Sequence, residues 1–293
     1  LRRAHRNGGG AAGIDRNLHE PVDVRHDVTP TEAIGFEGRQ KILAAAGVGN
    51  AIEHPVGRDR AAPADGVVAA ETVGWVTPFY LAYQGKNDRE LQEKYGSLIC
   101  EIMARRYPAL VVPPTMPPIL PNTPLRIGIV SAFFADHSNW KTPIRGWVEN
   151  INRDEFQIFG YYTGFSQDQD TERARQVCHE FVEGLPFEAL ARKIHDDALH
   201  ALIFPEIGMD PVTTKLAALR LVPVQCNSWG HPVTSGIPTI DYYLSSDLME
   251  PENGQDFYTE QLIRLPNISV HYTPPQYNIP ALTRRNFGLL EDK

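Results

Sequence analysis

The sequence has 293 residues, enough for one large domain or two ordinary ones with a sizeable core. It carries 28 Lys and Arg residues against 36 Asp and Glu residues, and the formal charge of −8 argues against a nucleic-acid partner, which needs clustered cations. No apolar run is long enough to span a membrane, and no apolar stretch typical of a secretory signal follows the N-terminus. With 42% hydrophobic residues, the composition predicts a soluble globular protein.

Cysteine usage indicates the compartment. Cys100, Cys178 and Cys226 are far apart in the sequence and form no CxxC pair. An odd, scattered set of this kind is neither a metal-binding pattern nor a disulfide framework. We therefore expect a reducing, cytoplasmic setting.

Residues 1–74 differ from the remainder of the chain. Of the 4 Trp, 11 Tyr and 12 Phe residues, only Phe36 falls in this segment, which is rich in Gly, Ala and Arg. Because few large apolar side chains leave little surface to bury, we expect a poorly structured or atypical N-terminal segment.

A helical segment and a linker are expected next, over residues 75–110 and 111–124. Apolar residues from Leu91 to Met103 recur at spacings of three and four, which predicts an amphipathic helix that begins after Asp88 and stops before Pro108. Residues 111–124 are rich in proline, which favours an extended linker and a domain boundary.

From residue 125 onward, strand and helix patterns alternate. Such alternation predicts an α/β fold, a Rossmann-like doubly wound parallel sheet over 125–275, preceded by the helical segment. Neither GxGxxG nor GxxxxGK occurs, so the glycine fingerprint of a dinucleotide-binding oxidoreductase is absent from the sequence. The predicted strands are 125–130, 156–162, 201–204, 222–226 and 242–244, and the predicted helices are 141–151, 170–181, 187–198 and 211–220.

The loops after the strands are where a parallel sheet binds its ligands. The loop after Val130 contains His137, which is either a base or orienting group for a polar ligand or a bystander beside helix-capping Asp136 and Ser138. Capping residues are common there, and we favour the second reading.

Two further strand-end loops contain glycines and polar groups. In the loop after Phe204, Gly208 permits close backbone approach to a ligand, although Asp210 as helix cap before Pro211 explains the pattern better. The loop 226–238 mixes His231 with several hydroxyl and amide groups, and we favour a binding loop there over a turn closed by its own Thr and Ser side chains.

Several of these segments resemble one family of enzymes. The stretches LRIGIVSAFFADH, INRDEFQIFGYY, LAALRLVPVQCNSWGHPVTSGIPTIDYYLSSDLMEP and QLIRLPNISVHYTPP are similar, in the same order, to the catalytic region of the O-linked N-acetylglucosamine transferase and SPINDLY family of glycosyltransferases. The resemblance implies a GT-B architecture, in which two Rossmann-like halves enclose the reaction cleft. It also implies transfer of a sugar, N-acetylglucosamine for this chain, from a UDP donor to Ser or Thr of an acceptor protein.

The resemblance assigns roles to individual residues. It implies that His137 and His231 are catalytic, with no metal and no cofactor beyond the nucleotide-sugar donor substrate. The substrate-binding residues that it implies, together with the loop glycine noted above, are Gly208, Gly230, Pro232, Thr234, Ser235 and Gly236.

The sequence also departs from the family pattern. Residues 276–293 resemble the start of the second half, and the nucleotide-binding residues of that half have no counterparts in this sequence. The tetratricopeptide repeats of the family, with a period of about 34 residues, are not recognisable, and 75–110 is a possible remnant of them. We therefore expect an acceptor-side half that is inactive alone. The alternative is a non-catalytic module that binds a protein or peptide.

Overall fold

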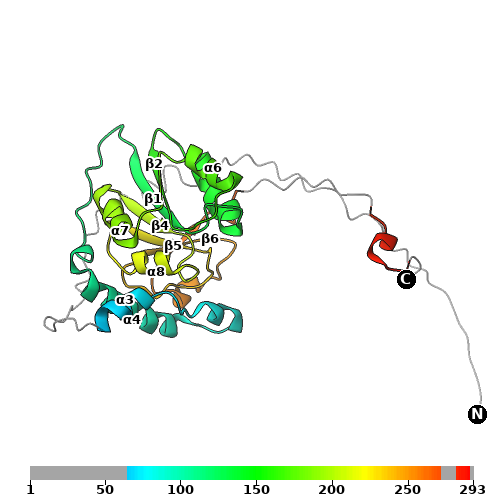
Figure 1. The fold of residues 1–293 in the computed structure, drawn as a ribbon, viewed down its shortest axis with the longest axis horizontal. Helices are drawn as coiled ribbons and strands as arrows, with labels where there is room; N and C mark the ends of the chain where they lie inside the picture. Colours follow the sequence, from blue (N-terminus) through cyan, green and yellow to red (C-terminus); the bar gives the residue numbers. More distant parts are fainter. Residues whose placement is uncertain (1–64, 272–281, 291–293) are drawn as a thin grey trace, which may run out of the picture.

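The computed structural model describes residues 65–271 and 282–290. Within these ranges the chain forms one seven-stranded parallel sheet with the order β3-β2-β1-β4-β5-β6-β7 (Figure 1). The Rossmann-like sheet that the sequence predicts is thereby confirmed. The strands are β1 Leu125–Ser131, β2 Phe156–Tyr162, β3 Glu180–Glu183, β4 Ala201–Phe204, β5 Gln225–Ser228, β6 Tyr242–Ser246 and β7 Gln261–Leu265.

Helices and short helical turns connect the strands and precede the sheet. None of the helices in the described residues is long and apolar enough to cross a membrane. The α-helices are α3 Asp65–Thr72, α4 Arg89–Arg106, α5 Arg145–Asn150, α6 Gln169–Val177, α7 Phe187–Asp196 and α8 Pro211–Ala217. The shorter turns are η1 Phe79–Gln84, η2 Pro108–Leu110, η3 Trp140–Ile144, η4 Gly254–Phe257 and η5 Arg284–Phe287.

The sheet buries both of its faces. Side chains of β1 and β2 alternate between two apolar clusters, as the pleat requires. One cluster contains Val130 and Phe159 and packs under α3, α4, α7 and α8. The other contains Ile129 and Ile158 and packs under η3, α5 and α6. Because helices cover both faces, a ligand reaches the sheet at the ends of its strands. We call the side at which the parallel strands end the carboxyl edge.

Several predicted elements have to be corrected. The helix predicted over 170–181 ends at Val177, because Cys178 adopts an extended conformation and β3 follows. The fourth predicted strand is displaced to β5, since Pro223 has no N–H with which to pair. The helix predicted over 211–220 ends at Ala217, and β7 was not predicted.

The N-terminal boundary at residue 74 also moves, because α3 occupies Asp65–Thr72. Ala70 and Val73 are buried in the same cluster as Ile99 and Met103 of α4. The two helices lie together at the bottom of Figure 1. The predictions for residues 1–64, 272–281 and 291–293 fall outside the described residues.

Helix α4 contacts the loop after β5 through two glycines. A Cβ atom on Gly96 would lie 1.9 Å from the backbone oxygen of Gly236, and one on Gly236 would lie 2.1 Å from the backbone of Gln92. Gly236 also has a φ of +66°, which glycine adopts readily. Backbone-to-backbone packing therefore fixes where α4 sits against the sheet.

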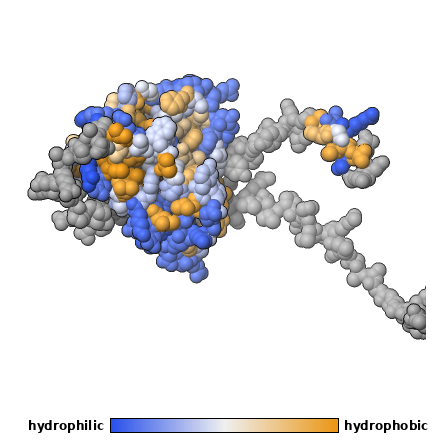
Figure 2. Space-filling model, turned by 60° about the horizontal axis from the view of Figure 1, so that its bottom comes forward, coloured by the Kyte–Doolittle hydropathy of each residue, from blue (hydrophilic) through white to orange (hydrophobic). Residues whose placement is uncertain are grey.

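Figure 2 turns the bottom of the molecule forward and shows hydrophobic patches among hydrophilic residues. Exposed apolar residues of this part of the chain include Trp75, Tyr80 and Tyr83 around η1 and Leu91 and Leu98 on α4. The helical segment thus packs one side against the core of the sheet and leaves aromatic rings exposed on the other side.

We predict that Gly96→Ala destabilises the protein by about 3 kcal/mol, since the added methyl group has no room against the Gly236 backbone. Urea unfolding measures the change. Ser97→Ala, on the exposed side of the same helix, is the matched control and leaves stability unchanged or slightly raised. Equal stability of the two variants would contradict the close packing.

Candidate functional site at the carboxyl edge of the sheet

The strand order reverses between β1 and β4, since β1 leads to β2 on one side and β4 leads to β5 on the other. Loops diverge at such a point, and open α/β sheets bind ligands there. Three loops meet at this edge. The side-chain amide of Asn139 donates to Met209 Sδ at 3.5 Å, and a Cβ atom on Gly230 would lie 2.3 Å from the Pro205 carbonyl oxygen. The loops after β1, β4 and β5 therefore form one contiguous surface.

His137 lies half-buried on the β1 loop. Its ring stacks on Phe133 with centroids 3.9 Å apart, and its Nδ1 accepts the backbone N–H of Asn139 at 3.1 Å. Because Nδ1 is the acceptor, the neutral ring carries its proton on Nε2. Burial lowers the pKa of His137, so the neutral ring predominates at pH 7. In this state His137 offers an N–H donor, which suits a hydrogen bond to a ligand oxygen better than proton abstraction.

The helix-cap explanation that the sequence favoured for this loop is wrong. Neither Asp136 nor Ser138 accepts a backbone N–H of the helix, and the N–H of Asn139 is accepted by His137 Nδ1 instead. Asp136 instead pairs with Lys141, and its backbone N–H donates to Asp168 Oδ2 at 2.8 Å. The polar residues around His137 thus tie the loop to its neighbours.

His231 has a different environment from His137. It is 4% exposed, and its ring stacks on Phe79 with centroids 4.6 Å apart. Its Nε2 lies 3.2 Å from the Phe79 carbonyl oxygen and therefore donates to it, while the Tyr243 hydroxyl donates to the His231 carbonyl at 2.9 Å. Burial lowers the pKa of His231. These contacts join the β5 loop to η1.

Gly208 lies against the ring of His231. It has a φ of +96°, and a Cβ atom there would lie 3.6 Å from His231 Nδ1. The Thr77 hydroxyl donates to the Gly208 carbonyl at 3.0 Å. The cavity between these residues holds about 10 Å³, room for roughly one water molecule. The structure thus brings Gly208 and His231 together, and the segment before α4 covers both.

Thr234 and Ser235 face a buried carboxyl group. Glu260, 2% exposed, accepts hydrogen bonds from the hydroxyls of both residues and from the Ser235 backbone N–H at 2.8 Å. The third residue of this motif, Gly236, contacts α4 as described above, whereas Pro232 is exposed. In this structure the motif ties the β5 loop to the start of β7.

The sequence interpretation of Asp210, in the loop after β4, as a helix cap is confirmed. Its Oδ2 accepts the Thr213 backbone N–H at 2.7 Å, and Pro211 is the first helical residue. The polar groups of this loop's C-terminal half therefore start α8.

Sequence reasoning missed Glu206, which follows the apolar strand β4 after one proline. Its side chain is fully buried, and Oε1 accepts the Ala132 backbone N–H at 2.8 Å. Burial raises the pKa of Glu206 to about 8, against the opposing effect of the Ala132 hydrogen bond. The available signal was an acidic residue placed directly after a buried strand, at the edge where ligands bind.

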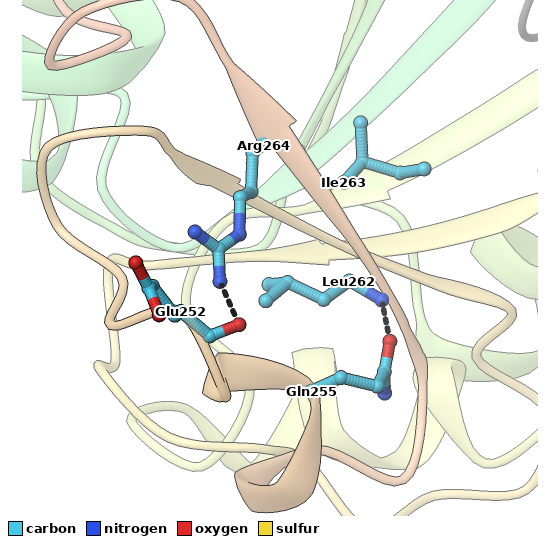
Figure 3. A pocket seen from close by; sticks show the side chains of 5 residues that line it. All are labelled: Glu252, Gln255, Leu262, Ile263 and Arg264. Atoms are coloured by element: carbon cyan, nitrogen blue, oxygen red, sulfur yellow. Dashed lines mark hydrogen bonds between the residues drawn. The ribbon is translucent and has the colours of Figure 1, made fainter.

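An open surface pocket of about 410 Å³ lies elsewhere, beside β7 (Figure 3). Its polar groups are already engaged: Gln255 Oε1 accepts the Leu262 N–H at 2.8 Å, and the Arg264 guanidinium donates to backbone carbonyls that include that of Glu252. None of the predicted site residues lines it. The strand-end loops remain the candidate site.

The fold and these loops define a Rossmann-like domain of the GT-B glycosyltransferase type. A solved structure of a Thermobaculum terrenum O-GlcNAc transferase mutant, K341M, is similar with a TM-score of 0.54 and 24% identity, over 65% of this chain and 36% of that one. The model of glycosyl transferase family 41 matches residues 88–273. The chain belongs to this family, and the resemblance expected from the sequence is confirmed.

The curated proteins that this chain resembles include plant and bacterial ones. A probable UDP-N-acetylglucosamine–peptide N-acetylglucosaminyltransferase SPINDLY of Solanum lycopersicum is 28% identical over 56% of this chain and 19% of its own length. The corresponding probable enzyme SEC of Arabidopsis thaliana is 28% identical over 70% and 22%. A UDP-glucose:protein N-beta-glucosyltransferase of Actinobacillus pleuropneumoniae is 25% identical over 52% and 24%. The chain thus spans about a fifth of the length of the relatives it matches.

We predict that Ser235→Ala lowers stability by about 1–3 kcal/mol, because it removes a hydroxyl donor from a buried carboxyl group. Chemical denaturation provides the measurement. Ser138→Ala, at an exposed position of the β1 loop, serves as control and changes stability by less than about 0.5 kcal/mol. A loss at Ser138 as large as that at Ser235 would refute the structural role of the contact with Glu260.

Proposed function

We propose that this chain supplies the acceptor-side half of a protein glycosyltransferase that transfers N-acetylglucosamine from a UDP donor to Ser or Thr of a protein. The observation that carries the proposal is the family 41 match over residues 88–273, which includes the loops gathered at the carboxyl edge. The plant relatives are named for transfer of N-acetylglucosamine to peptides, and this favours that sugar over the glucose of the bacterial relative. The setting proposed for this reaction is the cytoplasm.

The chemistry of the edge fits a supporting role in the transfer. Breaking the bond between the sugar and the diphosphate requires donors that stabilise the departing oxygen atoms and orient the acceptor hydroxyl. At pH 7 His137 offers a single N–H in the half-buried loop at the carboxyl ends of the strands. The groups that hold the nucleotide come, in this proposal, from a second Rossmann-like half, and no metal or other cofactor takes part.

A second candidate function is a non-catalytic module that binds a peptide. The exposed rings of Trp75, Tyr80 and Tyr83 favour it, because aromatic side chains are enriched at protein interfaces. Phe79, between them in the chain, stacks on His231, so these rings adjoin the candidate site. Binding of a Ser/Thr-rich peptide without any sugar transfer in the complete protein would favour the module.

We predict that residues 1–293 alone transfer no sugar and bind UDP with a dissociation constant weaker than about 1 mM. The physical reason is that the described residues provide one sheet of the two that enclose a GT-B cleft. Titration calorimetry with UDP tests this prediction. Tight binding that disappears in His231→Ala would show that the donor site lies on this half.

In the complete polypeptide encoded by the gene, His137→Ala is expected to reduce kcat/KM for transfer by about 100-fold or more, as loss of a preorganised donor does. The assay follows labelled N-acetylglucosamine from its UDP donor into a Ser/Thr peptide. His195→Ala, on the part-exposed end of α7, is the matched control and keeps its activity. Full activity of the His137 variant would exclude a role for this ring.

A further inference from the structure

Glu206 bridges the point at which the strand order reverses. It follows β4, and its Oε1 accepts the N–H of Ala132, the residue directly after β1, at 2.8 Å. Its side chain has no exposed surface, and its Oε2 has no hydrogen-bond partner among the described residues. A buried carboxyl oxygen without a partner is costly, and such groups concentrate where a fold serves function.

A short series of contacts leads from Glu206 to His137. Ala132, held by Glu206, precedes Phe133, whose N–H donates to Ser131 Oγ at 2.9 Å and whose ring stacks on His137. The anchored amide therefore sets the direction in which the chain leaves β1 and the place of the ring on which His137 rests.

A second tie joins the same two loops on the far side of His137. The backbone N–H of Met209 donates to the Glu206 carbonyl at 3.1 Å, and Met209 Sδ accepts from the Asn139 side chain. Asn139 in turn donates its backbone N–H to His137 Nδ1. The β4 loop thus holds the β1 loop at both ends of the segment that carries His137.

The surroundings of Glu206 favour its neutral form. Burial is the largest cause of its raised pKa, and Asp210, the charged group acting on it from the same loop, raises the pKa further. The neighbouring strand end contributes the Ala132 N–H and no charge. No cation among the described residues contributes to neutralising the carboxylate.

We infer that Glu206 is a positioning residue, a neutral carboxylic acid that holds the β1 loop and its His137 in the geometry required for transfer. The inference rests on the proposed function for its link to transfer. The claim that Glu206 positions the β1 loop concerns this chain alone and does not depend on transfer. Ionisation of Glu206 leaves an uncompensated charge buried between the β1 and β4 loops, and the solvation that this charge requires opposes the packing of the two loops.

The direction of the pH dependence follows from linkage. Folding raises the pKa of Glu206 from 4.5 to about 8, so between these values the native chain holds a proton that the unfolded chain has lost. Stability contributed by this proton is complete below pH 4.5, falls as pH rises toward 8 and is lost above it. Glu206→Gln keeps the acceptor for Ala132 and removes the titration.

The first experiment compares melting temperatures of the 293-residue chain and its Glu206→Gln variant between pH 5 and pH 8.5. The variant is expected to gain about 5–10 °C relative to wild type across this range, because only wild type loses the proton-linked stability. Glu93→Gln, at an exposed position of α4, controls for the change in charge and follows wild type. If the melting temperatures of Glu206→Gln and wild type changed in parallel with pH, Glu206 would not be a neutral acid in the native protein.

The second experiment reads His137 directly in a ¹⁵N-histidine NMR spectrum, where His137→Asn identifies its signal. In wild type and Glu206→Gln we expect an Nε2-protonated ring that titrates below its ordinary value of 6.5. In Glu206→Leu, which cannot accept from Ala132, the titration moves back toward 6.5. An unchanged His137 titration in a folded Leu variant would overturn the positioning role; if this variant does not fold, an altered His137 titration in Glu206→Gln would overturn it.

The third measurement is the pH profile of transfer by the complete polypeptide. Wild-type kcat is expected to fall about tenfold between pH 7 and pH 9, and this decline is absent in Glu206→Gln while the KM for the donor stays constant. A decline shared by both proteins would overturn the coupling to transfer. Absence of transfer at every pH would instead refute the proposed function, and the NMR and melting results would still decide the role of Glu206.

Discussion

The pairing of β1 with both β2 and β4 is the constraint on which the remaining structure depends. β1 is the first strand in sequence, yet it lies third from one edge, so the chain must build outward from it in two directions. Parallel pairing brings the carboxyl ends of the strands to one edge, and the divergence of the loops opens that edge between β1 and β4. The positions of His137 and Glu206 follow from this arrangement, because each comes from the loop of one of these two strands.

The helical segment before the sheet packs against the β4 and β5 loops at the carboxyl edge. Backbone contact between Gly96 and Gly236 places α4, and the chain before α4 then crosses the β4 and β5 loops. Phe79 stacks on His231 and accepts its Nε2–H, which leaves this imidazole enclosed. The two histidines that the resemblance linked as catalytic therefore have unlike roles in this structure. His137 lies half-buried in the loop after β1, and His231 joins the sheet to the helical segment.

Buried carboxyl groups hold the loops that follow β1 and β5. Glu260 gathers hydroxyl and amide donors and holds the β5 loop, whereas Glu206 receives one amide from the β1 loop and leaves one oxygen unpartnered. Glu260 is therefore a structural anchor, whereas Glu206 retains an oxygen that accepts no hydrogen bond among the described residues. The unpartnered oxygen of Glu206 is the feature from which its proposed positioning role is inferred.

The sequence by itself determined the fold class and most element positions, because period-two and period-3.6 apolar patterns are local properties of the chain. The family was indicated by the resemblance of several segments to known glycosyltransferases, and the family 41 match confirms it. The ranges of β2 and β4 and the cap at Asp210 follow from such patterns. The edge strand β7, the burial of His231 and the bridge from Glu206 to Ala132 depend on contacts between residues 74 to 152 positions apart or on pairing across the sheet. Local patterns carry no information on such contacts, so only the tertiary structure decided which of the predicted polar groups are enclosed by other segments and which remain partly exposed at the carboxyl ends of the strands.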